Sequence, residues 1–469
     1  MIQAPFSSQS RASQPFPPLL YKFCQAVADV GGKAWLVGGS VRDLCLSLPA
    51  KDLDIEVYGL DGAMLAGVAQ SFGRVEAVGK HFGVMKLWAE GLAMDLALPR
   101  TESKIGVGHR GFTVLPNADL STYEASLRRD FTINAMMLDP LTDELLDFHA
   151  GQEDLRQGIL RHVSPAFAED PLRVLRAMQF AARFKLQLAE ETAALCHRLL
   201  PEATTLPCSR IWCEWQKWAH AEYPSWGLQA LKDSGWLSCY PELNALQACL
   251  QDARWHPEGD VWVHTLQVCD QAARVAKRQK LGKAERELLI FAALCHDVGK
   301  PMTTFCDAEG HIHSPKHNEV GMQSATTFLQ SIAAPKQLVN HAALLVYDHM
   351  AHLCGEPTAR AIRRLAHRLE PVSIEMWEML VEADASGRHP SPACRPARIW
   401  LEKAEALGSH VEKVKPIVTG AWLLARGVAA GKGMGVIIKD AYEAQLDGLF
   451  DDEASAEQWW LAYTARDIA

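Results

Sequence analysis

The chain has 469 residues, of which 48% are hydrophobic and 22% are charged. This balance is typical of a folded protein with a large core, and the length predicts roughly two to four domains. The formal net charge of -9 excludes recognition of a polyanion by overall attraction. A nucleic-acid surface would therefore have to be a local basic patch.

Three further features limit the class of protein. The twelve cysteines include no Cys-x-x-Cys pair, which argues against a disulfide framework or a thiolate zinc site. Residues 1–18 are rich in Ser, Pro and Gln without the apolar core of a secretory signal, so we expect a disordered leader or a non-native remnant. No uncharged apolar run approaches the roughly 20 residues that cross a bilayer. The sequence predicts a cytoplasmic protein with no membrane partner.

The segment 19–162 alternates short strand-like runs with glycine turns and helical stretches, which predicts an α/β head. The expected strands are Ala34–Val37, Asp54–Tyr58, Met85–Trp88 and Met94–Leu98. After Pro165 the period becomes helical almost to the end, and the first expected helices are Asp170–Lys185, Glu190–Leu200 and Arg210–Ala219. Pro- and Ser-rich interruptions divide this part into a neck (163–226), a central domain (227–392) and a tail (393–469). The predicted class is α+β, with the helices after the head.

A glycine pair follows the first of these strands. Ala34–Val37 leads directly into Gly38-Gly39-Ser40-Val41-Arg42-Asp43 and then a helical stretch. Glycines at the end of a strand let backbone N–H groups approach a triphosphate, and the following helix N-terminus favours negative charge. Alone, such a pattern is more often a plain turn.

Three carboxylates come next. Asp52 and Asp54 fall on a predicted strand, where the two-residue period directs both side chains to one face. Asp95 lies on another apolar strand, where an acid is costly unless it binds something. Three carboxylates and two Mg²⁺ ions suit an in-line displacement by a 3′-OH with pyrophosphate leaving. The pattern predicts nucleotidyl transfer; a surface Asp-x-Asp and a hydrogen-bonded Asp95 are the structural alternative.

Two polar clusters further along the chain fit a nucleotide. The first enters an apolar run and combines phosphate-binding arginines with two groups that could bind ribose hydroxyls: Arg128, Arg129, Asp130 and Asn134. In the second, Asp170 and Arg173 open a predicted helix on one face, with Pro171 between them. A carboxylate beside a guanidinium matches the edge that cytosine and adenine share, an amine next to a ring nitrogen. Helix capping is the alternative for both clusters.

These motifs occur in one order, and the chain resembles the class II tRNA nucleotidyltransferases, the bacterial CCA-adding family, from about Leu19 to the tail. The resemblance implies a DNA polymerase β-like head in which Asp52 and Asp54 bind Mg²⁺ and Asp95 is a third catalytic acid. The segment Arg100–Phe112 resembles the family's flexible loop, and the segment from Arg210 to Glu214 resembles a helix that supports the base site. The nucleotide-binding residues that it implies are Gly38, Gly39, Ser40, Arg42, Arg128, Arg129, Asp130, Asn134, Asp170, Arg173 and Arg176.

The helical part contains a second group of metal-ligand types. Adjacent His296 and Asp297 lie in an otherwise apolar helix, where burial without a metal would cost several kcal/mol. With His264 and Asp384 they resemble the ligands of an HD metal-dependent phosphohydrolase domain, for Mg²⁺, Mn²⁺ or Ni²⁺. His317 and His349 are additional candidates. The sequence around His317 lacks the glycines common in relatives, which leaves the outer ligands and the hydrolysed substrate open.

The resemblance implies an enzyme that builds or repairs the 3′-terminal CCA of tRNA from CTP and ATP, releasing pyrophosphate. Its partners would be the tRNA 3′ end and acceptor stem, with a tRNA contact in the tail, and not DNA. A phosphatase or 2′,3′-cyclic phosphodiesterase activity would reside in the HD domain. The alternatives are a poly(A) polymerase, an enzyme adding only CC or only A, and an HD phosphohydrolase whose head merely binds RNA.

Overall fold

The structure is a computed structural model that describes residues 16–49, 52–77, 84–104, 112–117, 120–388, 394–409 and 414–466. Most of the predicted leader lies outside these residues. The chain forms two compact units. The first comprises Met1–Trp218 and Trp226–Cys239, and the second comprises Ala219–Ser225 and Tyr240–Ala469.

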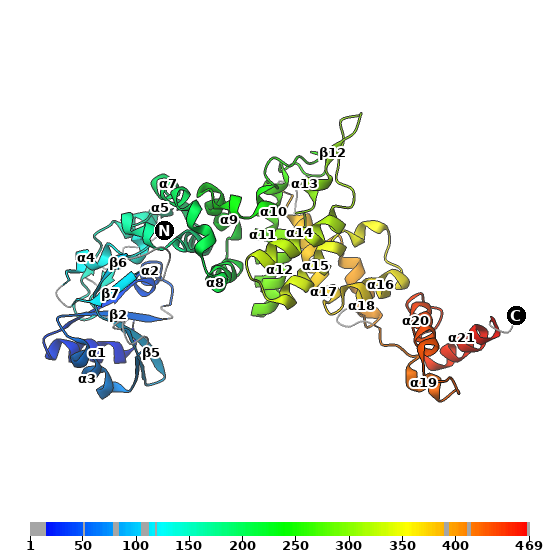
Figure 1. The fold of residues 1–469 in the computed structure, drawn as a ribbon, viewed down its shortest axis with the longest axis horizontal. Helices are drawn as coiled ribbons and strands as arrows, with labels where there is room; N and C mark the ends of the chain where they lie inside the picture. Colours follow the sequence, from blue (N-terminus) through cyan, green and yellow to red (C-terminus); the bar gives the residue numbers. More distant parts are fainter. Residues whose placement is uncertain are drawn as a thin grey trace. The chain divides into compact units, whose positions relative to one another are not determined.

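A seven-stranded sheet forms the centre of the head, in the order β3-β4-β5-β2-β1-β8-β9 (Figure 1). β1 pairs antiparallel with β2 and β8, whereas β2 pairs parallel with β5. The four predicted strands are present. The strands are β1 (Lys33–Val37), β2 (Leu53–Tyr58), β3 (Arg74–Ala77), β4 (Val84–Ala89), β5 (Leu92–Ala97), β8 (Met137–Leu138) and β9 (Leu145–Leu146).

Helices and short segments complete the head. Leu20, Phe23 and Val27 of the first helix are buried in its core. The predicted loop Arg100–Phe112 begins and ends in two paired strands, β6 (Arg100–Lys104) and β7 (Phe112–Pro116), while residues 105–111 lie outside the described part. The helices are α1 (Pro18–Asp29), α2 (Gly39–Cys45), α3 (Gly62–Phe72), α4 (Thr122–Ser126), η1 (Thr132–Asn134) and α5 (Gly151–Gln157).

The helices after the head differ in detail from the prediction. The helix expected at Asp170 begins at Arg173, because Asp170 precedes Pro171 and proline disfavours the helical conformation in the residue before it. Asp170 is extended, with φ -122 and ψ 100. One short strand, β11 (Gln187–Leu188), interrupts the expected all-α pattern; it pairs in parallel with β10 (Ile159–Leu160) at the end of the predicted α/β segment. The other elements are η2 (Pro165–Glu169), α6 (Arg173–Phe184), α7 (Glu190–Arg198), η3 (Leu200–Thr205), α8 (Cys208–Ala219), α9 (Pro224–Asp233) and η4 (Trp236–Cys239).

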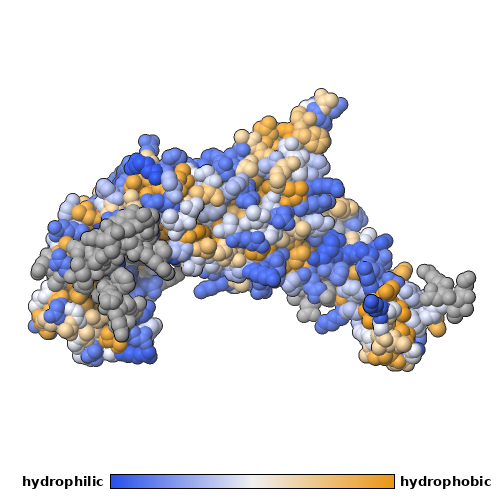
Figure 2. All heavy atoms as spheres, in the orientation of Figure 1, coloured by the Kyte–Doolittle hydropathy of each residue, from blue (hydrophilic) through white to orange (hydrophobic). Residues whose placement is uncertain are grey.

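The second unit is helical except for one small hairpin, as far as its described residues show. Its buried centre includes α12 (Lys283–Cys295), which packs on α11 (Val261–Arg278), α15 (Lys336–Asp348) and α17 (Ile374–Ser386). The hairpin, β12 (Phe305–Cys306) with β13 (Ile312–His313), projects from these helices (Figures 1 and 2).

The remaining helices of the second unit include a C-terminal group with its own apolar cluster, which contains Trp422, Leu423 and Phe450. They are α10 (Pro241–Asn244), α13 (Lys300–Thr303), α14 (His317–Ser331), η5 (Ala351–Cys354), α16 (Ala359–Leu369), α18 (Arg398–Ala406), α19 (Gly420–Leu424), α20 (Lys432–Leu446) and α21 (Glu453–Arg466). Within the described part of the chain, no helix combines the length and apolarity needed to span a membrane.

Candidate active sites

The glycine pair forms the turn between β1 and α2. Gly38 has φ 71, in the left-handed region that favours glycine. A Cβ atom at Gly38 would lie 3.4 Å from Nη1 of Arg129 and 3.7 Å from Oδ2 of Asp54. Because Gly38 has no side chain, a ligand can reach the backbone of this turn beside the Asp54 carboxylate and the Arg129 guanidinium.

Two of the three predicted catalytic carboxylates lie on neighbouring strands, Asp54 near the start of β2 and Asp95 in the second half of β5. Asp54 on β2 and Asp95 on β5 are direct partners in the parallel pair. Asp52 was predicted on this strand but lies immediately before β2, and it lines the same cavity as Asp54. Burial raises the pKa of Asp54, and the neighbouring Asp95 raises it further. Lys86 forms an ion pair with Asp95 at 3.2 Å, and the charges of Arg129 and Lys86 offset only part of the rise in the pKa of Asp54. A divalent cation would relieve this repulsion, so the oxygen ligands fit Mg²⁺.

Asp52 and Asp54 line a cavity of about 510 Å³, whereas the predicted catalytic Asp95 is not among its described lining residues. Every predicted nucleotide-binding residue except Arg128 lines it. The described lining residues are Gly38, Gly39, Ser40, Arg42, Asp43, Asp52, Asp54, Arg129, Asp130, Asn134, Asp170, Arg173, Arg176, Phe180, Arg183 and Arg210. Of these, Phe180 and Arg183 were not anticipated, although their positions on the helix after Arg173 and Arg176 continue the same face.

One wall of the cavity is a continuous polar network. The Arg42 guanidinium donates to Asp43 at 2.6 Å and to the Asn134 side-chain oxygen at 2.6 Å. Asn134 donates to Asp130, which in turn accepts two hydrogen bonds from Arg176, at 2.8 and 2.6 Å. Burial raises the pKa of Asp130, but Arg176 and Asn134 together bring this pKa below its ordinary value. This wall is therefore held in one arrangement with Asp130 ionised.

A buried carboxylate that the sequence did not single out holds both predicted arginines. Glu56 on β2 is 2% exposed and accepts from Arg128 at 3.0 Å and from Arg129 at 2.9 Å. Arg129 also reaches the cavity, whereas Arg128 is not among its described lining residues. The two-residue period from Asp54 to Glu56 places both on one face, which is the signal that could have identified Glu56.

The predicted base-reading pair, Asp170 and Arg173, also lines the cavity. Asp170 accepts from Arg210 at 2.8 Å, and its Oδ1 also accepts the Leu172 N–H. Arg173 donates to the carbonyl oxygens of Ala166 and Arg128, at 2.8 and 2.6 Å. Both side chains thus face the cavity with their orientations fixed. Arg210, predicted to support the base site, contacts it directly.

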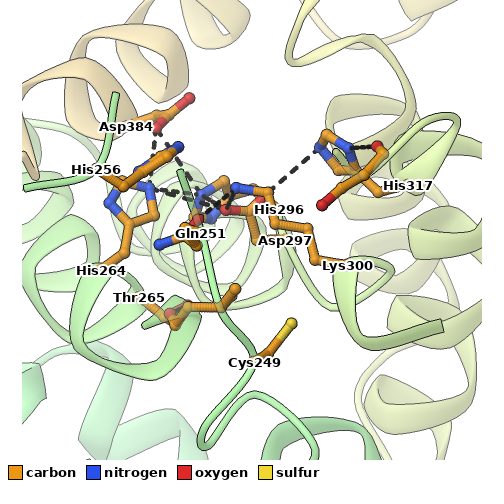
Figure 3. A network of polar contacts seen from close by, with 12 residues as sticks. Cys249, Gln251, His256, His264, Thr265, His296, Asp297, Lys300, His317 and Asp384 are labelled. Carbon is orange, nitrogen blue, oxygen red and sulfur yellow. Dashed lines mark hydrogen bonds and ion pairs between the residues drawn. The ribbon is translucent and has the colours of Figure 1, made fainter. Parts of the chain in front are cut away.

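The second group of predicted ligands converges in the core of the second unit (Figure 3). His264 on α11, His296 at the end of α12 and Asp384 on α17 place one ligand atom each within 4.8 Å of the others. The Nε2 atoms of His264 and His296 are 3.2 Å apart, and Asp384 Oδ1 lies 3.1 Å from His264 Nε2. Asp297 Oδ2 lies 3.2 Å from His296 Nε2. All four predicted core ligands meet here.

The two additional candidates form a second group around the same carboxylate. Asp297 Oδ1 lies 3.3 Å from His317 Nε2 and 3.9 Å from His349 Nε2. Burial and the neighbouring His296 lower the pKa of His349 to about 3, so its ring is neutral at ordinary pH. Asp297 therefore presents one oxygen to each histidine group, an arrangement that could bridge two cations.

The orientation of the histidine rings explains why these nitrogens can bind metal. The Nδ1 atoms of His296, His317 and His349 each lie 2.7 to 2.8 Å from the backbone carbonyl three residues earlier. A carbonyl accepts the Nδ1 proton, which leaves the Nε2 lone pair directed to the centre. Neutral imidazoles and carboxylates are the ligands that divalent transition metals prefer. The residues therefore fit a divalent cation.

Sequence reasoning did not anticipate Glu258, His256 and Lys300 beside this centre. The fully buried Glu258 carboxylate lies 2.7 Å from Nδ1 of His264 and 2.9 Å from Nδ1 of His256. Burial raises the pKa of Glu258, but these two rings lower this pKa to about 2. The Glu258 carboxylate is therefore ionised. Lys300 Nζ lies 2.7 Å from Asp297 Oδ2. No spacing rule connects residues in a loop to a helix that follows it.

Two known domain families match the parts of the chain that carry the two sites. The Poly A polymerase head domain family matches residues 34–161, and the HD domain family matches residues 261–370. A multifunctional CCA protein from Nitrosococcus oceani is 36% identical over 80% of this chain and 91% of its own length. Another, from Neisseria meningitidis, is 39% identical over 76% of this chain and 83% of its own length. The chain belongs to the multifunctional CCA protein family. The predicted membership of the CCA-adding nucleotidyltransferases, with an HD domain, is confirmed.

Solved structures support the fold. The CCA-adding enzyme of Bacillus stearothermophilus, determined in complex with CTP, superposes with a TM-score of 0.63 at 21% identity, covering 96% of this chain and 99% of that one. The Thermotoga maritima CCA-adding enzyme complexed with tRNA gives a TM-score of 0.58 at 20% identity, covering 96% of both chains. The predicted class, a polymerase β-like head followed by helical parts, is confirmed.

Proposed function

We propose that the cavity of the first unit adds C, C and A to the 3′ end of tRNA from CTP and ATP, releasing pyrophosphate. The observation that carries this proposal is Asp54, which pairs with Asp95 across two strands and lines, with Asp52, a cavity that several arginines also line. Membership of the multifunctional CCA protein family supports it, as do structural relatives solved with CTP, ATP or tRNA.

The carboxylates would hold Mg²⁺, which when bound lowers the pKa of the attacking 3′-OH and neutralises charge on the leaving pyrophosphate. The chain's own residues position the reactants. The Gly38 turn and Arg129 lie where a triphosphate would meet backbone N–H groups and a guanidinium. The fixed network through Asn134 and Asp130 offers polar groups for the ribose.

Base selection would come from Asp170 and Arg173. Their carboxylate and guanidinium can pair with the amine and ring nitrogen that cytosine and adenine share, whereas uracil and guanine present the opposite pattern. Arg210 holds the Asp170 carboxylate in place. No nucleic-acid template is needed, because the protein supplies the pairing edge.

A primer-extension assay tests this function and its rivals. Three tRNA substrates, ending at the discriminator base, at C and at CC, are incubated with Mg²⁺ and single nucleotides. We expect CTP alone to add two residues to the first substrate and ATP alone to add one residue to the third. Continued addition of A would indicate a poly(A) polymerase, and extension of only some substrates would indicate an enzyme adding CC or A alone.

The second unit supports a second activity, a metal-dependent phosphohydrolase. This activity is inferred from the position of Asp297, whose two carboxylate oxygens face two separate histidine groups. A divalent cation there, such as Mg²⁺, Mn²⁺ or Ni²⁺, would activate water and polarise a phosphate ester. Hydrolysis of 2′,3′-cyclic AMP and of a phosphomonoester is measured with each ion after chelation. Absence of hydrolysis with every ion would remove this activity.

A further inference from the structure

A third group of metal-ligand types lies on the hairpin β12–β13, apart from the residues of either site above. Asp307 directly follows β12, His311 directly precedes β13, and His313 is the last residue of β13. Phe305 pairs with His313 across the hairpin, and the Asp307 N–H donates to the His311 carbonyl at 2.9 Å. The hairpin backbone therefore holds the three side chains in a defined register.

The two histidines flank Ile312, and both side chains reach Asp307. Both approach the same carboxylate oxygen: His313 Nε2 lies 2.7 Å and His311 Nδ1 lies 3.5 Å from Asp307 Oδ2. The three ligand atoms all lie within 4.8 Å of one another. Three ligands thus converge on one point at the surface.

The carboxylate is fixed by the turn itself. Asp307 Oδ1 accepts the N–H groups of Glu309 and His311, at 3.1 and 2.7 Å. These bonds leave Oδ2 free to face the histidines. A rigid ligand loses little conformational entropy on binding, which distinguishes this cluster from flexible surface side chains.

An ion pair alone does not account for this arrangement. One protonated imidazole suffices to pair with Asp307, and a second positive ring beside it would be repelled. The two histidine side chains are about half exposed, which leaves room for water to complete the coordination of an ion held by two ring nitrogens and a carboxylate.

We propose that Asp307, His311 and His313 bind a divalent transition-metal ion, such as Zn²⁺ or Ni²⁺, on the hairpin β12–β13. Nitrogen donors favour these ions over Mg²⁺. With zinc–ligand distances of about 2.0–2.1 Å, tetrahedral ligand atoms lie roughly 3.4 Å apart. The Asp307–His311 separation of 3.5 Å already matches. The Asp307–His313 separation of 2.7 Å needs to open by about 0.7 Å, a small side-chain rotation.

The experiment uses Zn²⁺ as the probe and the full-length protein. Equilibrium dialysis with elemental analysis gives the number of bound ions and their affinities for the wild type and for a variant with His311→Gln and His313→Gln. The matched control is His367→Gln, which changes an exposed histidine of α16. Asp307→Asn tests the carboxylate separately.

We expect the hairpin variant to lose one equivalent of Zn²⁺ and Asp307→Asn to weaken that equivalent at least about tenfold. The control should bind as the wild type does, and circular dichroism should be unchanged in all four proteins. Unchanged stoichiometry and affinity in the hairpin variant would overturn the proposal. An equal loss in the His367→Gln control would also overturn it, since it would indicate non-specific binding by surface histidines.

Discussion

Glu258→Gln should weaken metal binding at the histidine centre of the second unit while leaving the fold intact. The wild-type carboxylate is fully buried and lies 2.7 Å from His264 Nδ1. A carboxylate in this position accepts the Nδ1 proton, directs the Nε2 lone pair to the metal and raises the basicity of the ring. Glutamine has the same shape without the charge. Loss of such a partner lowers metal affinity about 10–100-fold, or about 1.4–2.8 kcal/mol.

The measurement is Ni²⁺ and Mn²⁺ affinity by calorimetry, together with the pH dependence of binding. Burial lowers the pKa of His264, whereas Asp384 and Glu258 raise it. Loss of the Glu258 charge should therefore lower this pKa and shift the acidic decline of metal binding to a lower pH than in the wild type. Glu356→Gln, at an exposed position, is the matched control. Addition of CCA should be unaffected in both variants. If Glu258→Gln binds metal as tightly as the control with an unchanged pH profile, Glu258 does not orient His264.

Further predictions concern the head and its independence from the second unit. Asp54→Asn should reduce addition of both C and A by at least about 10²-fold while tRNA binding in a gel shift persists, since both steps share one metal site; substantial incorporation would remove the catalytic assignment. Arg173→Ala should cost about 1–3 kcal/mol of discrimination against UTP and GTP, and an unchanged misincorporation ratio would leave it a structural residue. Burial and Asp95 raise the pKa of Asp54, and protonated Asp54 cannot bind Mg²⁺. Asp95→Asn should therefore shift the acidic limb of Mg²⁺ binding to lower pH. An unshifted limb would contradict the coupling between Asp54 and Asp95. His296→Ala with Asp297→Ala should abolish hydrolysis and spare CCA addition, and loss of addition in the folded variant would show that the two sites are not separable.

Local pattern alone determined much of this protein. The strands of the head follow from alternating apolar runs, and Gly38 follows from a turn that needs a positive φ. His296 and Asp297 were recognisable because two adjacent ionisable groups in an apolar segment need a compensating ligand, although they directly follow α12 and do not lie inside it as predicted. These features depend on neighbours in the chain, so the sequence expresses them directly. Pro171 also carried a local signal, its effect on Asp170, and applying it would have placed the helix start correctly.

Only the tertiary structure decided which distant residues meet. The strand period shows that Asp95 points to one face, but the parallel pairing of β2 with β5 places it opposite Asp54. In the same way, the packing of α11, α12, α15 and α17 brings two histidine groups to the two oxygens of Asp297. Glu258 acquires its contact with His264 from the path of the loop before α11. Periodicity specifies a direction and not a partner, because pairing and packing depend on the free energy of the whole folded chain.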